Sequence, residues 1–322
     1  EGAVLMSKTV NGATLPEELA AYSLPFFYGS FTNFGLDYLL DAAAVQDLLK
    51  LSSGGDKVSA GIFEDGKALV SLNYQQYFAQ FRRGSGVTQE IELNVVAFPT
   101  KDAALTPKLT YKRYAHGEDQ TRRLGFWRTH VDCDSQVAID AGKALFDEPK
   151  YKSGFTYTLP VPNGTTPAAA PPEEAKKRAD AVDVWHVDCG VFGSEAKGVF
   201  PADKIYYTID ANLRGLTPQP VSAAPFTEYG SRSVTVNSQT KKRPVAAPLN
   251  VFAPYTWYDL TTDAGKGKVT VKLGKVKQHH PGSYTETFIK LITGKDPVGA
   301  WVFQSPPVAV QNRPNWMHAD VS

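Results

Sequence analysis

The 322-residue chain has only two cysteines, lacks a long run of apolar residues and carries a formal net charge of only +1. So few cysteines cannot form a disulfide scaffold, and a membrane-spanning helix needs about 18 to 20 consecutive apolar residues. Because no basic stripe is interleaved with aromatic residues, nucleic acid binding has no electrostatic basis. We therefore expect a soluble protein that binds neither nucleic acid nor membranes. The two cysteines suit a reducing compartment at least as well as an oxidising one, so we favour the cytoplasm and leave secretion open.

Signatures of several common enzyme classes are also missing. The sequence has no phosphate-binding loop, no glycine fingerprint of a dinucleotide-binding fold and no G-x-S-x-G nucleophile elbow. Nothing in it calls for a metal or an organic cofactor. A composition of 42% hydrophobic and 21% charged residues is ordinary for a globular protein with a sizeable core. Such a core can support a preorganised pocket.

Short segments with β-strand character dominate the chain. Helical spacing is confined to residues 39–51, 135–146 and 285–293. The predicted strands cover residues 68–72, 89–97, 108–114, 125–131, 155–159, 182–191, 204–209, 233–236 and 268–275. Many short strands with few helices favour an antiparallel sheet closed into a barrel or cone, so we predict a mainly β fold.

We expect residues 1–322 to form a single domain with two proline-rich insertions. Residues 160–172, which read PVPNGTTPAAAPP, are predicted to form a loop or lid edge. Residues 218–254 contain six prolines and few strand signals. An irregular decoration that lines the pocket or an oligomer contact is predicted there.

The stretch VDCDSQVAIDAGKALFDEPK, residues 131–150, places a single lysine directly after a proline at the end of a predicted short helix. Asp134 or Ser135 can cap this helix, and Pro149 cannot continue it. Beyond the lysine, aromatic residues alternate as in a half-buried strand. Lys150 is therefore predicted to lie at a helix-to-strand junction, where apolar walls would partly desolvate its amine.

This segment resembles the acetoacetate decarboxylase family. In that family a helix of the type A-I-x-x-G-[RK]-x-L precedes a Pro-Lys pair, and the matching residues here are Val137, Ala138, Ile139, Gly142, Lys143, Leu145, Pro149 and Lys150. Upstream, residues 86–90 resemble the family's G-x-Y-x-E motif, whose active-site glutamate corresponds to Glu90. Weaker matches at 40–49, 68–70 and 305–307 extend the resemblance over most of the chain.

The chain departs from the family at three positions. Tyr151 replaces a second lysine that usually follows the nucleophile, Asn73 replaces a second carboxylate, and the region around Phe31 lacks the family's arginine. The resemblance implies that Tyr151, Asn73 and Phe31 are substrate-binding positions. The candidates to replace the missing arginine are Arg82, Arg83, Arg122, Arg123 and Arg128.

The resemblance implies that Lys150 and Glu90 are catalytic and that Lys150 forms a Schiff base with a small keto acid or related carbonyl compound. A lysine attacks a carbonyl only when neutral, yet its reference pKa is about 10.4, so burial or a neighbouring cation must lower the pKa. The protonated imine is then an electron sink for loss of carbon dioxide, retro-aldol cleavage or removal of an α-proton. Glu90 would position the substrate or move a proton at the enamine carbon. Relatives in the family form oligomers, so the resemblance leaves open that this chain forms a homo-oligomer.

Three functions remain open from the sequence. Decarboxylation leads, and aldolase- or dehydratase-type chemistry on the same lysine comes second. The third is a scaffold that has lost catalysis and binds a small carbonyl ligand. Titration of Lys150 near neutrality would favour an enzyme, whereas titration near pH ~10 would favour a binding protein.

The sequence His-Val-Asp-Cys occurs twice, at residues 130–133 and 186–189, each time in a predicted strand. Alternation places each histidine with its aspartate on one face of the strand and each cysteine on the other. If the two strands were paired in register, these side chains could hold a divalent metal. We favour two neighbouring strands with hydrogen-bonded polar faces and cysteines that pack inward as small apolar residues.

Overall fold

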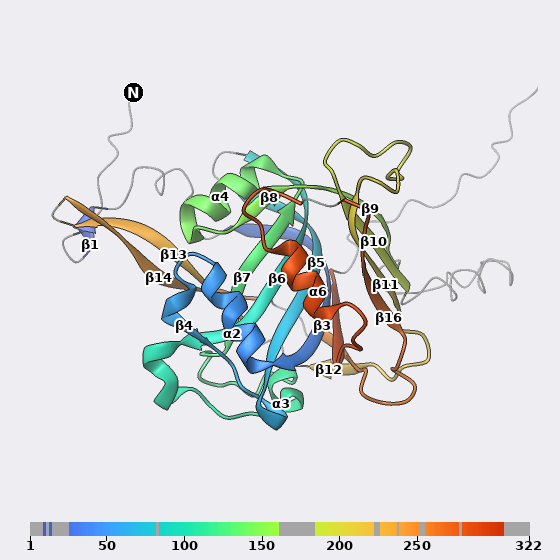
Figure 1. Cartoon of the computed structure of the whole chain (residues 1–322), viewed down its shortest axis with the longest axis horizontal. Helices are drawn as coiled ribbons and strands as arrows, with labels where there is room; N and C mark the ends of the chain where they lie inside the picture. The colour runs from blue at the N-terminus through green and yellow to red at the C-terminus, as the bar shows by residue number, and fades with distance from the viewer. Residues whose placement is uncertain are drawn as a thin grey trace, which may run out of the picture.

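A computed structural model describes residues 9–10, 13–14, 26–81, 84–160, 184–221, 226–236, 238–251, 255–276 and 279–305. Two β-sheets form most of this structure, and a few helices pack against them (Figure 1). Residues 161–172 of the first predicted insertion lie outside the described residues. Of the helices in these ranges, none has the length and apolar character that crossing a bilayer requires.

In the described residues the larger sheet has 11 strands and the smaller sheet has four. The larger sheet consists of β3 (Phe27–Asp41), β4 (Val58–Ala60), β5 (Lys67–Phe81), β6 (Gly84–Pro99), β7 (Gly125–Cys133), β8 (Lys150–Lys152), β12 (Gln219–Val221), β13 (Phe226–Val236), β14 (Gln239–Leu249), β15 (Tyr255–Asp259) and β17 (Gly299–Gln304). The smaller sheet consists of β9 (Gly154–Thr158), β10 (Val184–Gly190), β11 (Ile205–Asn212) and β16 (Val269–Leu273), and a separate pair consists of β1 (Thr9–Val10) and β2 (Ala13–Thr14). The helices are α2 (Ala42–Leu51), α3 (Tyr111–Ala115), α4 (Gln136–Phe146) and α6 (Thr285–Ile292), with 3₁₀ turns η1 (Gly55–Lys57), η2 (Glu64–Gly66) and η3 (Thr100–Leu105).

The larger sheet follows the order β12-β15-β17-β3-β5-β6-β7-β13-β14, with β4 paired to β6 and β8 paired to β7. Its pairs are antiparallel except for β7 with β8 and β7 with β13, which are parallel. The predicted mainly β fold with few helices is confirmed. The pairing path in the described residues ends at β12 and β14, and closure of the sheet into a barrel or cone stays a prediction.

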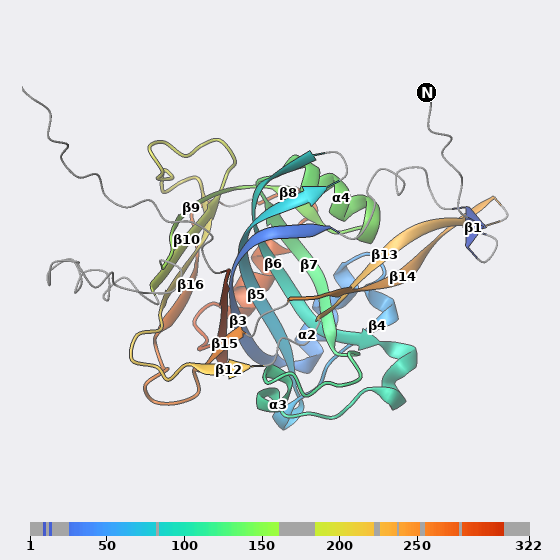
Figure 2. The same cartoon turned by 180° about the vertical axis from the view of Figure 1, so that it is seen from behind.

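The main apolar core lies between one face of the larger sheet and the smaller sheet, with α2 and α6 included (Figures 1 and 2). Phe34 of β3 and Trp185 of β10 stack across this layer at a centroid distance of 4.8 Å. Helices α2 and α6 add buried apolar side chains such as Leu48 and Phe288. Polar and aromatic side chains lie on the opposite face of the larger sheet. The side chains of the candidate site are among them.

The predicted helices at 39–51, 135–146 and 285–293 are confirmed as α2, α4 and α6, with shifted ends. The strand predicted at 108–114 is wrong, because residues 111–115 form the short helix α3. Thr110 caps this helix, and its side chain accepts a hydrogen bond from the Arg113 backbone N–H. A threonine cap supports a helical turn that β-propensity alone does not predict.

The irregular conformation predicted at 218–254 is wrong for residues 226–236 and 239–249, because β13 and β14 form a long antiparallel hairpin that extends from the body (Figures 1 and 2). The predicted contribution of this segment to a pocket lining is confirmed by Tyr229 and Lys242. Pro244 and Pro248 lie in β14, which is the last strand of the sheet. Proline lacks a backbone N–H, but an edge strand tolerates it because one of its sides needs no partner. The prolines therefore mark a sheet edge, and β13 reaches the candidate site.

Candidate active site

Lys150 is the first residue of β8 and follows the turn at the end of α4 (Figure 1). Ser135 caps the start of α4 by accepting a hydrogen bond from the Ala138 backbone N–H, and Asp147 ends it in the left-handed conformation with φ of 53°. Strand β8 then runs parallel to β7, with Lys150 opposite Val131. The predicted helix-to-strand junction is confirmed, and the Lys150 side chain is only 5% exposed.

Lys150 and Glu90, which the sequence analysis predicts to be catalytic, are in direct contact. The Lys150 amine forms an ion pair with Glu90, and its Nζ lies 3.7 Å from a carboxylate oxygen of Glu148. All three side chains are almost completely buried. The fold thus brings two residues that are distant in sequence into one buried ion-pair network.

Arg128 connects Glu148 to two further glutamates. Its guanidinium lies 2.5 Å from Glu92 and 2.6 Å from Glu228, and it also pairs with Glu148. We refer to Lys150, Arg128 and the glutamates at 90, 92, 148 and 228 as the carboxylate cluster. Acidic groups outnumber cations in this buried cluster, so protons must neutralise part of its charge.

Strand alternation explains why these side chains meet. In β6, Glu90 and Glu92 alternate with the fully buried Ile91 and Leu93, which pack into the main core on the opposite face. A register shift between β6 and β7 after Leu93 places Arg128 opposite the residue that follows it. Arg128 therefore projects from the same face as the two glutamates of β6.

Amide side chains of β5 hold two of these carboxylates. Gln75 Nε2 donates hydrogen bonds to Glu90 Oε1 at 2.6 Å and to Glu92 Oε1 at 2.8 Å. Asn73 Nδ2 donates to Glu92 Oε2 at 3.2 Å. Asn73, at the position where the resemblance placed a second carboxylate, thus contacts the cluster through Glu92 of the neighbouring strand. Contact of Asn73 with a substrate stays a prediction.

The pKa values of the glutamates in the carboxylate cluster shift in different directions. Burial raises the pKa of Glu228 to about 7 and also raises the pKa of Glu92, although Arg128 lies beside both. Burial acts on Glu148 in the same direction, but Arg128 and Lys150 outweigh it and hold the pKa of Glu148 below its ordinary value. Near neutral pH the cluster therefore contains both protonated and ionised carboxyl groups.

The pKa of Lys150 moves in the direction opposite to the expectation from sequence. Burial lowers this pKa, but Glu90, the Cys133 thiol and Glu148 together raise it by more than burial lowers it. Arg128 also lowers the pKa without reversing the result. The Lys150 amine is therefore an ammonium ion at neutral pH, and it must lose a proton before it can attack a carbonyl.

Tyr151 lies on the opposite face of the larger sheet from Lys150, as alternation requires. Its ring stacks between His130, at a centroid distance of 4.9 Å, and His280, at 5.0 Å. His130 in turn lies 3.1 Å from the buried carboxylate of Asp132. The Tyr151 side chain thus points away from that of Lys150, although both residues line one cavity. The role of Tyr151 in substrate binding stays a prediction.

Phe31 lies beside the carboxylate cluster in a group of aromatic rings. Its ring centroid is 6.0 Å from that of Tyr28, 6.3 Å from Tyr77 and 5.8 Å from Phe303. Burial and the charge of Glu90 raise the pKa of Tyr77, which indicates that this group is close to the cluster. Contact of Phe31 with a substrate stays a prediction.

Of the candidate arginines that the structure describes, Arg128 is the one in the cluster. Arg122 and Arg123 lie in the turn before β7, and residues 82–83 lie outside the described residues. Three carboxylates of the protein already pair with Arg128. Its guanidinium is therefore not free to bind the carboxylate of a substrate in the way expected of the family's arginine.

Glu148 and Glu228 also belong to the site, although neither was predicted from the sequence. Glu148 directly precedes Pro149 and Lys150, and this adjacency was a usable signal for an acid beside the nucleophile. Glu228 had no such signal, because β13 reaches the site through its parallel pairing with β7.

A cavity of about 420 Å³ lies beside Lys150. Its lining includes Lys150, Tyr151, Arg128 and Glu148, together with Tyr284 from the segment before α6. Pockets for small molecules typically enclose roughly 300 to 1,000 Å³, so this cavity suits a small organic molecule.

Gly142 allows α4 to pack closely against the cluster. A Cβ atom at this position would lie 2.2 Å from Glu148 Oε2 and 3.2 Å from Lys150 Cδ. The glycine of the motif is therefore required by the packing of these two side chains.

Replacement of Gly142 by alanine is expected to displace Glu148 and to lower the free energy of unfolding by about 1–3 kcal/mol, because the added methyl overpacks the site. Urea unfolding followed by circular dichroism measures this change. Gly86→Ala is the matched control, since a Cβ there meets no atom within 4 Å. Equal stabilities of the two variants would contradict this packing.

The two His-Val-Asp-Cys segments lie in different sheets, one in β7 and one in β10. The register pairing that a shared metal site required is therefore wrong, as is the assumption that the strands are neighbours. The polar faces are confirmed, since His186 lies 3.2 Å from Asp188 and 2.7 Å from Asp210. Cys133 and Cys189 are free and buried, as expected for small apolar residues.

No family model and no curated protein sequence matches the chain. Among solved structures, the enduracididine biosynthesis enzyme MppR, complexed with the condensation product of pyruvate and imidazole 4-carboxaldehyde, matches with a TM-score of 0.52 at 11% identity. This match covers 88% of the chain and 86% of MppR. The chain has the acetoacetate decarboxylase-like fold. MppR complexed with pyruvate gives a TM-score of 0.51, again at 11% identity, over 88% of this chain and 87% of that one.

An acetoacetate decarboxylase from Legionella pneumophila subsp. pneumophila str. Philadelphia 1 also superposes, with a TM-score of 0.49 at 10% identity over 88% of this chain and 84% of the other. The match to MppR confirms the predicted resemblance at the level of the fold. At such low identity the likeness concerns the fold.

Proposed function

We propose that Lys150 forms a Schiff base with a small keto acid and that the resulting enamine makes or breaks a carbon–carbon bond. The observation that carries this proposal is the buried Lys150 amine in contact with Glu90, in a residue that contributes to the lining of a cavity of about 420 Å³. The fold is shared with MppR, one structure of which is complexed with pyruvate. Condensation of the amine with a ketone forms the imine and releases water.

Carbon–carbon bond chemistry fits the carboxylate cluster better than decarboxylation alone. After the imine forms, a base must remove an α-proton to give the enamine, and an acid must protonate the oxygen of an incoming aldehyde or of a leaving hydroxyl group. The cluster offers carboxyl groups in both states near neutral pH, with Glu228 and Glu92 raised in pKa and Glu148 lowered. MppR complexed with a condensation product of pyruvate and an aldehyde gives further support.

Decarboxylation, which the sequence analysis favours, is the second outcome of the same imine. It requires only the electron sink and one proton delivered to the enamine carbon. The resemblance around Lys150 and Glu90 supports it. Release of carbon dioxide from acetoacetate would identify this outcome.

Exchange of the methyl protons of pyruvate in D₂O tests the proposal. Enamine formation by Lys150 requires loss of a methyl proton, and reversal of this step introduces deuterium. We expect enzyme-dependent loss of the methyl signal in proton NMR, without release of carbon dioxide. A folded protein that causes no exchange and releases no carbon dioxide from acetoacetate would contradict the proposal.

Replacement of Glu90 by glutamine is expected to separate imine formation from proton transfer. Because Glu90 is the largest cause that raises the pKa of Lys150, its removal lowers this pKa, and imine formation should occur at lower pH. In the unmodified chain, with the pKa raised, imine formation should increase with pH from 6 to 10, about tenfold per unit. Methyl exchange should fall by roughly 10²- to 10⁴-fold in Glu90→Gln, because the variant lacks the base.

Borohydride trapping across this pH range measures imine formation, and NMR measures exchange. Glu118→Gln is the control, since Glu118 is an exposed glutamate paired with Arg113. A pH profile that does not move in Glu90→Gln would contradict the electrostatic role of Glu90.

One observation favours a non-catalytic binding protein as a second candidate function. The raised pKa of Lys150 is the direction that the sequence analysis associates with a binder. A ligand would then rest on the cavity walls without covalent attachment. Saturable binding of pyruvate without methyl exchange and without a trapped adduct would support this function in place of the enzyme.

A further inference from the structure

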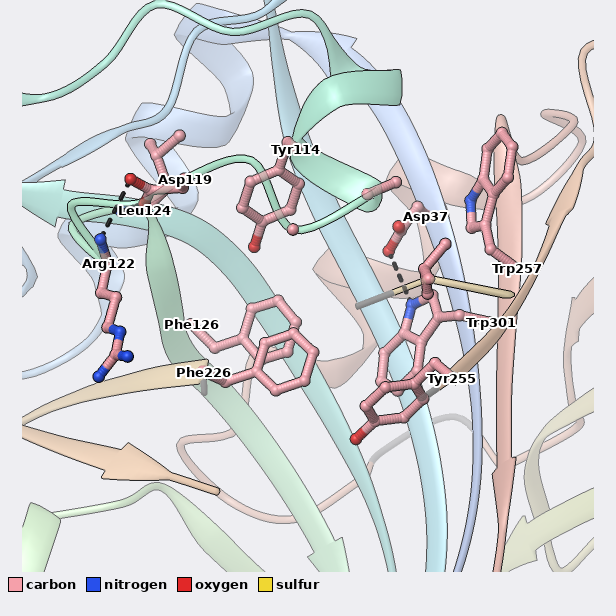
Figure 3. A pocket seen from close by; sticks show the side chains of 13 residues that line it. Asp37, Tyr114, Asp119, Arg122, Leu124, Phe126, Phe226, Tyr255, Trp257 and Trp301 are labelled. Carbon is pink, nitrogen blue, oxygen red and sulfur yellow. Dashed lines mark hydrogen bonds between the residues drawn. The ribbon is translucent and has the colours of Figure 1, made fainter. Parts of the chain in front are cut away.

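A second cavity, of about 70 Å³, lies between the larger sheet and the loop that follows α3 (Figure 3). Its lining comes from β3, β7, β12, β13, β15 and β17 and from residues 114–124. It shares no lining residue with the cavity beside Lys150. A water molecule needs roughly 10–15 Å³ by the same kind of measure, so the space can hold a group of about five heavy atoms.

Asp37 supplies a buried carboxylate to this cavity. Its Oδ2 accepts a hydrogen bond from the Tyr111 hydroxyl at 3.0 Å, and its Oδ1 accepts one from Trp301 Nε1 at 3.3 Å. Burial raises the pKa of Asp37 to about 6, and its hydrogen bonds limit this rise, so the group is mostly ionised at neutral pH. In the described part of the chain, no lysine, arginine or histidine forms an ion pair with Asp37. The carboxylates around Arg128, by contrast, have cationic partners.

Aromatic rings form the other walls of the cavity (Figure 3). Phe126 and Phe226 stack at a centroid distance of 5.4 Å. The Tyr255 ring makes T-shaped contacts with Phe226 and Trp301, at centroid distances of 5.7 Å and 5.3 Å. Trp301 is held over Gly35 of β3, where a Cβ atom would lie 1.9 Å from the indole. The rings are therefore fixed by packing before any ligand enters.

The remaining polar groups of the lining leave Asp37 as the dominant charge. The carboxylate of Asp119 is occupied by its own loop, since it accepts hydrogen bonds from the backbone N–H groups of Thr121, Arg122 and Leu124. The Tyr114 hydroxyl is buried and has no hydrogen-bond partner within the described structure, and it points into the cavity (Figure 3). Arg122 lies at the exposed rim, and in Figure 3 its guanidinium points away from Asp37.

We propose that this cavity binds a small organic cation, an alkylammonium or guanidinium group, between the Asp37 carboxylate and the faces of Trp301, Tyr255 and Phe226. A buried anion without a cationic partner attracts a cation, and aromatic faces stabilise a cation that has lost its water. The Tyr114 hydroxyl is available to accept a hydrogen bond from an N–H group of the ligand. This site is independent of the proposed chemistry at Lys150.

Binding of tetramethylammonium, guanidinium and the neutral alcohol tert-butanol, which has the same number of heavy atoms as tetramethylammonium, to the full chain at pH 7.5 tests the proposal. Calorimetry and saturation-transfer NMR measure each dissociation constant. We expect saturable binding of at least one cation, with the neutral alcohol at least about tenfold weaker, because the alcohol has a similar shape but no charge. Equal or tighter binding of the alcohol, or no saturable binding of either cation, would overturn the proposal.

Substitutions locate the site. Asp37→Asn keeps the shape of the side chain and is expected to weaken cation binding about tenfold or more. Tyr255→Leu should weaken it several-fold through loss of a ring face. Asp263→Asn is the matched control at an exposed aspartate, and it should leave binding unchanged. Unchanged binding in folded Asp37→Asn would contradict the proposal, and the comparison of cation with alcohol in the unmodified chain decides the matter if this variant does not fold.

Discussion

Replacement of Lys150 by methionine is expected to abolish methyl exchange of pyruvate, lowering the rate by about 10³-fold or more. The thioether occupies a similar volume but cannot form an imine. Lys150→Arg extends the test, because a guanidinium keeps a positive charge beside Glu90 and Glu148 but stays protonated and does not attack a carbonyl. Both variants should lose activity, and the arginine variant should retain more of the stability of the cluster.

Lys152→Met is the matched control for the Lys150 variants. Lys152 lies in the same short strand, and its amine donates a hydrogen bond to the Asp134 backbone carbonyl. Its ammonium also lies over the Phe192 ring, 4.2 Å from the centroid. We expect this variant to keep methyl exchange within a few-fold. Loss of exchange in Lys152→Met together with retention of exchange in Lys150→Met would show that Lys152 is the nucleophile and would contradict the role proposed for Lys150.

Replacement of Arg128 by methionine should produce the largest loss of stability, about 3–5 kcal/mol, because it leaves buried carboxylates without their cation. Three glutamates contact this guanidinium. Without it the raised pKa values of Glu92 and Glu228 rise further and the lowered pKa of Glu148 rises, so Glu92 and Glu228 bind protons more tightly in the folded than in the unfolded chain. A carboxyl group with a raised pKa in the folded state stabilises the fold at low pH, and this contribution is lost as pH rises through that pKa. The destabilisation should therefore be greater at pH 8 than at pH 5.

Chemical denaturation of both proteins at these two pH values measures the Arg128 effect. Arg113→Met is the matched control, since Arg113 forms an exposed ion pair with Glu118 and surface pairs contribute little to stability. A loss of stability that is equal in the two variants, or that decreases with rising pH, would contradict the account of the cluster.

The sequence is sufficient to predict the parts of the site that depend on local order. Ser135 and Pro149 bound α4 for local reasons of capping and backbone geometry, so the junction at Lys150 could be predicted. Contact between Lys150 and Glu90 followed from the resemblance to a known family. Strand β3 was missed although Phe34, Leu36 and further apolar residues alternate within it, because helical spacing that begins at Leu39 overlaps its end.

Other features depend on pairing between distant segments and could not be predicted. Glu228 joins the cluster only because β13 pairs with β7 in parallel. The direction of the pKa shift of Lys150 requires a count of the carboxylates that surround it, and this count depends on the fold. Asp37 likewise becomes a buried anion among aromatic rings only when β3, β15 and β17 lie together.

Borohydride reduction of the protein in the presence of pyruvate, followed by peptide mass mapping, tests the central claim most directly. Reduction converts an imine into a stable secondary amine, so the adduct records which lysine reacted. The account predicts a single pyruvate-derived adduct on Lys150, with more adduct formed as pH increases. An adduct on another lysine, or no adduct in the folded protein at any pH from 6 to 10, would contradict it.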